Sequence, residues 1–195
     1  MPKVDLEKER KLLDREITFF HFKRATRKIK KCIKLAEETK DDFFLSYFLA
    51  QRCILRQDYR RAMHYFNCAL HIRKNDGCTY NDKALCLAEL GRLKEALACF
   101  NRGIKRNRDC ASLYHNKGWL LHSLGRHKEA AVCFKKALEL EAGRVESLYS
   151  LADTYCHLND LQQARQLFHR ALRLIKGKSS YAHKQTLKKL NKLER

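Results

Sequence analysis

The chain has 195 residues, of which 45% are hydrophobic and 33% charged; this composition supports a packed domain or short repeat array and argues against global disorder. Its formal net charge of +20 keeps polyanions among the candidate partners. One proline, at position 2, and only seven glycines leave little in the body of the chain to interrupt a helix, so an all-α fold is expected.

The N-terminal segment, residues 1–42, predicts a degenerate helical hairpin that caps the molecule. Two helices are expected, roughly Val4 to Phe22 and Arg24 to Thr39, the second with Ile29, Cys32 and Ile33 on one side. Residues 1–11 are charged throughout and lack the apolar core of a secretory signal, and no apolar run approaches the length of a membrane span. A cytoplasmic location is therefore expected.

The densest positive cluster of the chain lies in this hairpin and is a candidate surface for polyanions. It comprises Lys23, Arg24, Arg27, Lys28, Lys30, Lys31 and Lys34. Such a cluster attracts nucleic acid or anionic lipid in a salt-sensitive, sequence-independent way.

Four units of 34 residues follow without insertion or deletion, at 43–76, 77–110, 111–144 and 145–178. Small residues occupy the eighth, twentieth and twenty-seventh places, and phenylalanine occupies the twenty-fourth. The columns are Ala50, Ala84, Gly118 and Ala152; Ala62, Ala96, Ala130 and Ala164; Ala69, Gly103, Ala137 and Ala171; and Phe66, Phe100, Phe134 and Phe168. Small residues let the two helices of a unit cross closely, while the phenylalanine fills the gap to the next unit. Gly91 and Gly125, at the fifteenth place, suit the turn between helices.

This spacing, and the segment Leu113 to Leu140 in particular, resembles the tetratricopeptide repeat family. The resemblance implies a right-handed α-solenoid of stacked helix-turn-helix repeats. Where the family often has a proline near the end of a unit, this chain has Lys74, Arg108, Ala142 and Lys176, so the second helices are expected to run on further. Residues 179–195 predict a C-terminal capping helix with an apolar side formed by Tyr181, Ala182, Leu187 and Leu190.

The resemblance further implies that the first helices of the units line a concave groove. Carried over residue by residue, it assigns to the groove Phe44, Tyr47, Gln51, Asn81, Leu85, His115, Trp119, His122, Glu146, Tyr149 and Asp153. A partner peptide or helix with an apolar anchor and a basic flank would complement this set. Two alternatives stay open: Trp119 packs between repeats, or the N-terminal hairpin itself fills the groove over Phe44 and Tyr47.

Some family members bind chaperone C-termini through a clamp of Lys, Asn and Arg residues. The corresponding places do not match the clamp; in one register they hold Tyr47, Gln51, Asp82, Ser112 and Asn116. Binding of chaperone tails is therefore not expected.

No catalytic motif stands out, and no catalytic residue, cofactor or metal site is expected. Two sets of residues that include histidines are spaced so that they share one side of a helix, as metal ligands can, but neither set brings an obvious fourth ligand. They are His115, Trp119 and His122, and His64, Cys68 and His71. The nine cysteines are scattered singly and odd in number, which is typical of small core residues in a reducing compartment.

The sequence thus predicts a non-enzymatic scaffold or adaptor that binds a protein partner in the groove. The alternative is a nucleic-acid or anionic-surface binding module that uses a basic convex face and the cluster at residues 23–34. Self-association through a terminal hairpin also stays open.

Overall fold

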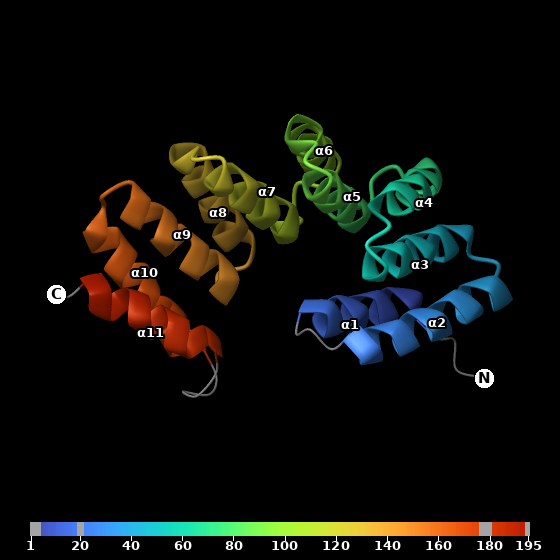
Figure 1. The fold of residues 1–195 in the computed structure, drawn as a ribbon, viewed down its shortest axis with the longest axis horizontal. Coiled ribbons are helices and arrows are strands. Elements are labelled where there is room, and N and C mark those ends of the chain that lie inside the picture. The colour runs from blue at the N-terminus through green and yellow to red at the C-terminus, as the bar shows by residue number, and fades with distance from the viewer. Residues whose placement is uncertain (1–4, 19–21, 176–180, 194–195) are drawn as a thin grey trace. The chain divides into compact units, whose positions relative to one another are not determined.

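The computed structural model describes residues 5–18, 22–175 and 181–193, and all regular structure in these ranges is helical. The predicted segments 1–42, 145–178 and 179–195 each extend in part beyond the described residues. The helices are α1 (Leu6–Thr18), α2 (Phe22–Glu38), α3 (Asp42–Leu55), α4 (Tyr59–Ile72), α5 (Gly77–Glu89), α6 (Leu93–Arg106), α7 (Ala111–Ser123), α8 (His127–Leu140), α9 (Val145–His157), α10 (Leu161–Leu174) and α11 (Tyr181–Leu193) (Figure 1). They form two compact units, residues 1–106 (unit 1) and 107–195 (unit 2).

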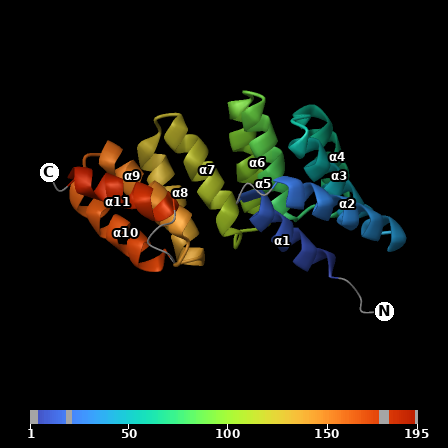
Figure 2. The ribbon, with the colours of Figure 1, turned by 60° about the horizontal axis from the view of Figure 1, so that its bottom comes forward.

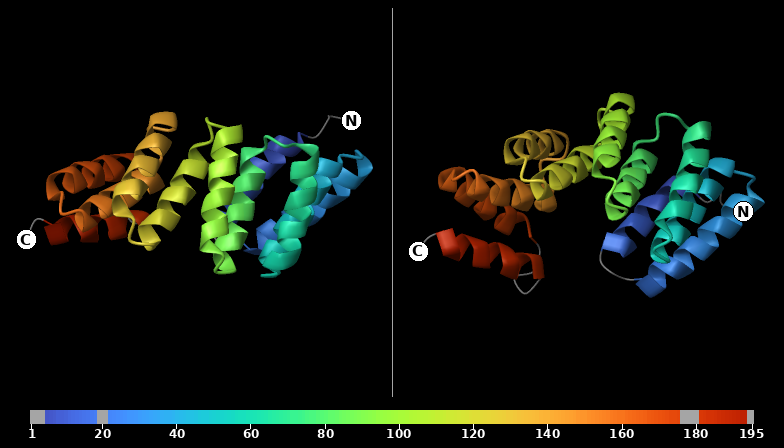
Figure 3. Two further views of the ribbon diagram at one scale, coloured as in Figure 1. Left: turned by 90° about the horizontal axis from the view of Figure 1, so that it is seen from above. Right: turned by 45° about the horizontal axis from the view of Figure 1, so that its top comes forward.

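Unit 1 contains three consecutive helical hairpins. Helix α1 pairs with α2, α3 with α4 and α5 with α6, and each hairpin packs on the next through α2 against α3 and α4 against α5 (Figure 3). Because each isolated hairpin leaves an apolar face uncovered, stacking is what buries it.

Unit 2 contains two hairpins and a terminal helix. Helix α7 pairs with α8 and α9 with α10, α8 packs on α9, and α11 lies against α10 (Figure 2). The fold class predicted from the sequence, all-α with stacked helix-turn-helix repeats, is confirmed within each unit.

The repeated columns occupy equivalent interior places. Phe66, Phe100, Phe134 and Phe168 are each completely buried, and so are the four alanines of the twentieth place. At Gly118 the close helix crossing is explicit, because an added Cβ would lie 2.9 Å from Phe134 Cε1 and 3.2 Å from Cys133 Cβ. The sequence prediction that small residues permit this crossing is therefore correct.

The fifteenth place of every repeat adopts a left-handed backbone. Gly91 and Gly125 have φ values of 72° and 73°, and the same place holds Gln57 at 59° and Asn159 at 61°. Glycine adopts this conformation without steric cost, whereas glutamine does not. The turn geometry is thus common to all four repeats although only two carry the favoured residue.

The second helices do not run on past the places where the family has proline. Helices α4, α6 and α8 end at Ile72, Arg106 and Leu140, each two residues before the place in question. That expectation was wrong for these three repeats, and the fourth such residue, Lys176, lies outside the described residues. After α4 the chain turns and Asp76 starts α5, where its side chain accepts a hydrogen bond from the Thr79 amide at 2.8 Å.

The C-terminal helix buries a different side from the one predicted. Leu190 is 3% exposed as expected, but Thr186 is its buried neighbour, whereas Tyr181 is 78% exposed and Leu187 40%. The reason is the register of α11 against α10, which periodicity alone does not set. No helix in the described part of the chain combines the length and apolarity needed to cross a bilayer.

Candidate functional site

The eleven predicted groove residues fall on four helices, α3 and α5 in unit 1 and α7 and α9 in unit 2. These are the first helices of the four repeats. The shared positions have different surroundings in the two units.

In unit 1 the predicted groove residues surround a carboxylate. The Tyr47 hydroxyl donates to Asp82 Oδ2 at 2.8 Å, Gln51 Nε2 donates to the same oxygen at 2.5 Å, and Asn81 Nδ2 donates to Oδ1 at 3.1 Å. Burial raises the pKa of Asp82, and the hydrogen bonds from Tyr47 and Asn81 oppose that rise. Tyr47, Gln51 and Asn81 are all buried, so their polar atoms serve the interior.

Helix α1 covers this network through one guanidinium. Arg10, which is 6% exposed, donates from Nη1 to both carboxylate oxygens of Asp76 at 3.1 and 2.9 Å. Its guanidinium carbon lies 5.2 Å from the ring centroid of Tyr47 and 5.9 Å from that of Phe44. Burial opposes the charge on Arg10, but Cys78, Asp76 and Tyr47 more than offset this and raise its pKa. A charged side chain from the N-terminal hairpin therefore lies against Phe44 and Tyr47, two of the predicted groove residues of unit 1.

A second arginine, Arg73, packs on the same face. Arg73 lies 4.0 Å from the ring centroid of Phe43 and 4.7 Å from that of Phe44, and it pairs with Asp41 and with Glu7 of α1. Leu85, the remaining predicted groove residue of this unit, is half-buried. The roles of Arg10 and Arg73 were missed by sequence reasoning, since helical periodicity gives no sign of a contact between residues 66 positions apart.

In unit 2 the same positions carry histidines that bridge α7 and α9. His115 Nδ1 lies 2.9 Å from Ser147 Oγ, and His122 Nδ1 lies 2.9 Å from Thr154 Oγ1. Burial lowers the pKa of His115 to about 4. Burial also lowers the pKa of His122, although the neighbouring Asp153 opposes that shift.

Trp119 lies between these two bridges on α7 and is 50% exposed. It is the only tryptophan of the chain. Glu146 on α9 is exposed, and Tyr149 is half-buried, with its ring centroid 5.5 Å from that of Phe168. Burial raises the pKa of Tyr149. Unit 2 thus presents an aromatic side chain and a carboxylate at places where the first repeat of unit 1 has the buried Gln51 and Phe44.

Asp153 contacts side chains of three helices. Its Oδ1 accepts a hydrogen bond from Lys189 of α11. Its Oδ2 lies 3.5 Å from His122 Nε2 and 4.0 Å from His157 Nε2. His127, at the start of α8, stacks on His157 with ring centroids 4.6 Å apart.

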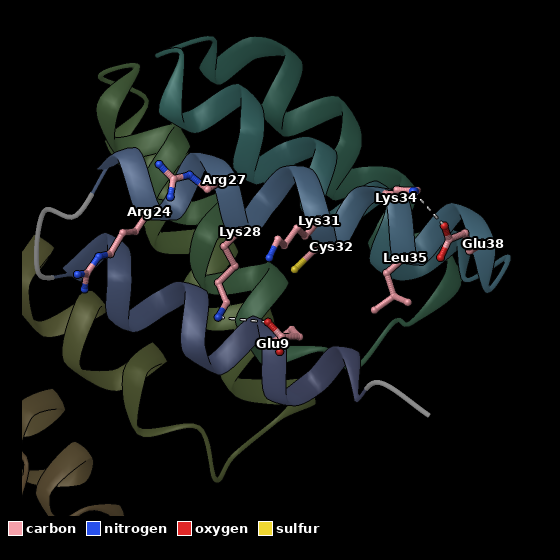
Figure 4. A pocket seen from close by; sticks show the side chains of 9 residues that line it. All are labelled: Glu9, Arg24, Arg27, Lys28, Lys31, Cys32, Lys34, Leu35 and Glu38. Atoms are coloured by element: carbon pink, nitrogen blue, oxygen red, sulfur yellow. Dashed lines mark ion pairs between the residues drawn. The ribbon is translucent and has the colours of Figure 1, made fainter. Parts of the chain in front are cut away.

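The basic cluster of α2 divides between two hollows. The first, of about 640 Å³, lies between α1 and α2 (Figure 4). Its lining is Glu9, Arg24, Arg27, Lys28, Lys31, Cys32, Lys34, Leu35 and Glu38. Within it Lys28 pairs with Glu9 at 3.2 Å and Lys34 with Glu38 at 3.7 Å, which neutralises part of the charge (Figure 4). Lys30 lines a separate hollow with Arg52 and Arg56 of the next hairpin, and Lys23 is exposed.

Two tetratricopeptide repeat family models match the chain, one over residues 76–140 and one over residues 121–186. Together they span residues 76–186, which is more than half of the chain. The chain is a tetratricopeptide repeat protein. A third model, anaphase-promoting complex subunit 5, matches residues 12–59 alone. A search among curated proteins finds no significant match.

Solved tetratricopeptide proteins share the fold of this repeat protein. TTC0263 from Thermus thermophilus has a TM-score of 0.74 at 17% identity, over 97% of this chain and 99% of that one. YrrB, described as having an unusual peptide-binding site, has a TM-score of 0.61 at 18% identity, over 94% and 92% of the two chains. The first repeat domain of Spaghetti (RPAP3), bound to an HSP90 peptide, gives 0.55 at 17% identity over 60% and 90%. Identities this low carry the fold alone.

Proposed function

We propose that this tetratricopeptide repeat protein is a non-enzymatic scaffold that binds a segment of another protein on the face of unit 2 formed by α7 and α9. The observation that carries the proposal is the exposure of Trp119. At the same ninth place of the repeat, Gln51 of unit 1 is 3% exposed, whereas Trp119 is 50% exposed. Half-exposed tryptophans held on a rigid helix are frequent energetic centres of protein interfaces.

The chemistry of this face defines the partner segment. Trp119 offers a flat apolar surface for an aliphatic or aromatic anchor, and the exposed Glu146 favours a basic residue beside that anchor. YrrB is described as having a peptide-binding site and RPAP3 as bound to a peptide, which supports a peptide segment as the ligand class here. Nine cysteines, five of them buried, are compatible with the proposed cytoplasmic location.

A peptide library displayed on phage and selected against the full chain tests the proposal. We expect enriched peptides that combine an apolar anchor with Lys or Arg, and a shift of the fluorescence of Trp119 when they bind. Trp119→Ala, alone and with Tyr149→Ala, should weaken binding by at least about tenfold, as expected for the central residue of an interface. Val132→Ala, on the exposed side of α8, is the matched control because Val132 is 67% exposed but lies outside the face. Equal binding by Trp119→Ala would overturn the proposal.

A second candidate function is a polyanion contact at the hollow between α1 and α2. The observation that favours it is the gathering of Arg24, Arg27, Lys28, Lys31 and Lys34 around one depression (Figure 4). Retention on heparin or RNA should fall steeply with salt and fall further when Arg24, Arg27 and Lys31 are changed to glutamine.

Changing three exposed basic residues of α6 to glutamine, Lys94, Arg102 and Lys105, removes the same charge elsewhere and serves as the control. Equal loss in both triple variants would mean that total charge, and not the hollow, governs retention. Self-association, the remaining prediction, is checked by sedimentation of the same proteins.

A further inference from the structure

A cluster of metal-ligating side chains lies on unit 2 at the C-terminal ends of α7 and α9. His122, Asp153 and His157 each direct a ligand atom into one small volume, and the three atoms lie within 4.8 Å of one another. Asp153 and His157 are four positions apart on α9 and so share a helix face, while His122 comes from α7. Stacking of the two repeats therefore assembles a set that neither helix carries alone.

We propose that His122, Asp153 and His157 form a binding site for a divalent transition-metal ion of the zinc class. Two imidazole nitrogens and one carboxylate oxygen make up the donor set, which suits zinc and similar ions and does not suit magnesium or calcium.

The distances are close to those that the ion requires. Zinc bonds of about 2.0–2.1 Å in a tetrahedron place the ligand atoms about 3.3 Å from one another. Asp153 Oδ2 lies 3.5 Å from His122 Nε2 and 4.0 Å from His157 Nε2, and the two histidine ligand atoms lie within 4.8 Å of each other. Small rotations of two side chains close this difference, and the half-exposed His157 has the freedom to make one of them. Three protein ligands leave the fourth position to water or to a side chain of a partner.

The hydrogen bonds around the cluster fix the tautomer of His122. The Thr154 hydroxyl donates its only proton to the Ser150 carbonyl at 2.7 Å, so its oxygen accepts from His122 Nδ1 at 2.9 Å. In the neutral ring the proton therefore sits on Nδ1, and the lone pair of Nε2 faces the Asp153 carboxylate. Two electron-rich atoms that face each other at 3.5 Å repel unless a proton or a metal ion lies between them. A bound metal ion removes this repulsion, and Thr154 then orients the ligand in the way that supporting groups do in metal sites.

Lys189 orients the Asp153 carboxylate. It pairs with Oδ1 of Asp153, which leaves Oδ2 on the side of the two histidines. The ammonium orients the carboxylate but also repels a cation nearby. His127 stacks on His157 and its Nδ1 is buried without a hydrogen-bond partner, so it is a further imidazole beside the site.

The test is a titration of the full chain with Zn²⁺ against a chromophoric chelator, repeated with Co²⁺ as a spectroscopic substitute. We expect one equivalent to bind, with the visible absorption of tetrahedral Co²⁺ and without the near-ultraviolet band of a cobalt thiolate. His122→Ala with His157→Ala should weaken binding by at least about tenfold, and Thr154→Val, which removes the orienting hydroxyl, should also weaken it by about tenfold. Zn²⁺ should raise the Tm of the unchanged protein and not that of the double variant.

The matched control is His71→Ala with His169→Ala, which removes two exposed histidines from other helices and should leave the affinity unchanged. If the double histidine variant loses helicity, Asp153→Asn is used in its place, because it keeps the size of the side chain. The proposal is overturned if the unchanged protein does not compete for Zn²⁺, if the variants bind as tightly as it does, or if a thiolate band shows that cysteines hold the ion. No partner protein takes part, so this test is independent of the proposed scaffold function.

Discussion

The first and second units place different chemistry at the same repeat positions. In unit 1, Tyr47 and Gln51 turn inward to Asp82, and Arg10 from the N-terminal hairpin lies over them. In unit 2 the corresponding helices keep Trp119 half-exposed and use histidines as bridges. A repeat scaffold therefore does not leave every predicted groove position exposed to a partner. Whether such a position is a binding surface or part of the core depends on what packs across it.

Removal of the Arg10 guanidinium tests whether the N-terminal hairpin closes unit 1. Arg10→Ala removes the cationic partner of the largely buried Asp76 carboxylate and uncovers Tyr47, so we expect a loss of about 3 kcal/mol in the free energy of unfolding. Urea unfolding gives the magnitude, and hydrogen exchange should place the loss in α1, α3 and α5.

Arg92→Ala is the matched control, because Arg92 pairs with Glu95 on the surface at 2.7 Å. Its effect should be much smaller, since exposed pairs contribute little to stability. Equal effects of the two variants would mean that Arg10 does not close unit 1.

The pH dependence of stability should reveal the buried histidine bridge of unit 2. The pKa of His115 falls from 6.5 to about 4 on folding because the ring is buried. Between these values the unfolded chain binds a proton that the folded chain does not, so stability is full above about pH 6.5 and falls as the pH is lowered toward 4. We expect this bridge to account for about 3 kcal/mol of the loss, measured by urea unfolding across that range.

His115→Gln removes the titrating group and keeps a polar side chain beside Ser147. Its unfolding free energy should vary less with pH over the same window. A variant as sensitive to pH as the unchanged protein would show that another group causes the loss.

Substitution of Gly118 tests how closely α7 and α8 cross in unit 2. Gly118→Ala places a methyl group 2.9 Å from the completely buried Phe134 ring, so we expect a loss of about 1–3 kcal/mol despite the better helix propensity of alanine. Gly143→Ala, where nothing lies within 4 Å, should leave the midpoint of thermal unfolding nearly unchanged. A stabilised Gly118→Ala variant would contradict the close crossing.

Substitutions in the left-handed turns of the two units should change the stability least. Gln57→Gly in unit 1 relieves a left-handed glutamine at φ 59° and should stabilise by about 0.5 kcal/mol, after the greater flexibility of the unfolded chain is subtracted. Asn159→Gly in unit 2 should gain less, because asparagine tolerates this conformation better. Differential scanning calorimetry of both variants would show the order, and the reverse order would contradict it.

Much of the fold and little of the candidate site could be predicted from the sequence. The alanine and phenylalanine columns predicted the helical hairpins and their buried places because these contacts recur at a fixed spacing within one repeat and its neighbour. The sequence pattern placed His122 and Asp153 among the groove residues, but helical spacing relates metal ligands only along a single helix. It therefore missed that α9 brings Asp153 and His157 beside His122.

The sequence by itself determined that the chain is helical, where its repeats lie and that the alanine and phenylalanine columns of the repeats are buried, since periodicity and side-chain size act locally. Tertiary structure alone decided that Arg10 meets Asp76 and that Lys189 meets Asp153, pairs 66 and 36 positions apart. Such contacts depend on how the terminal helices pack on the repeats, and a single long-range ion pair leaves no periodic trace in the chain. The physical reason is that the stacking of repeats depends on many weak contacts that recur at a fixed spacing. Closure of one face and assembly of a ligand cluster each depend on a few side chains.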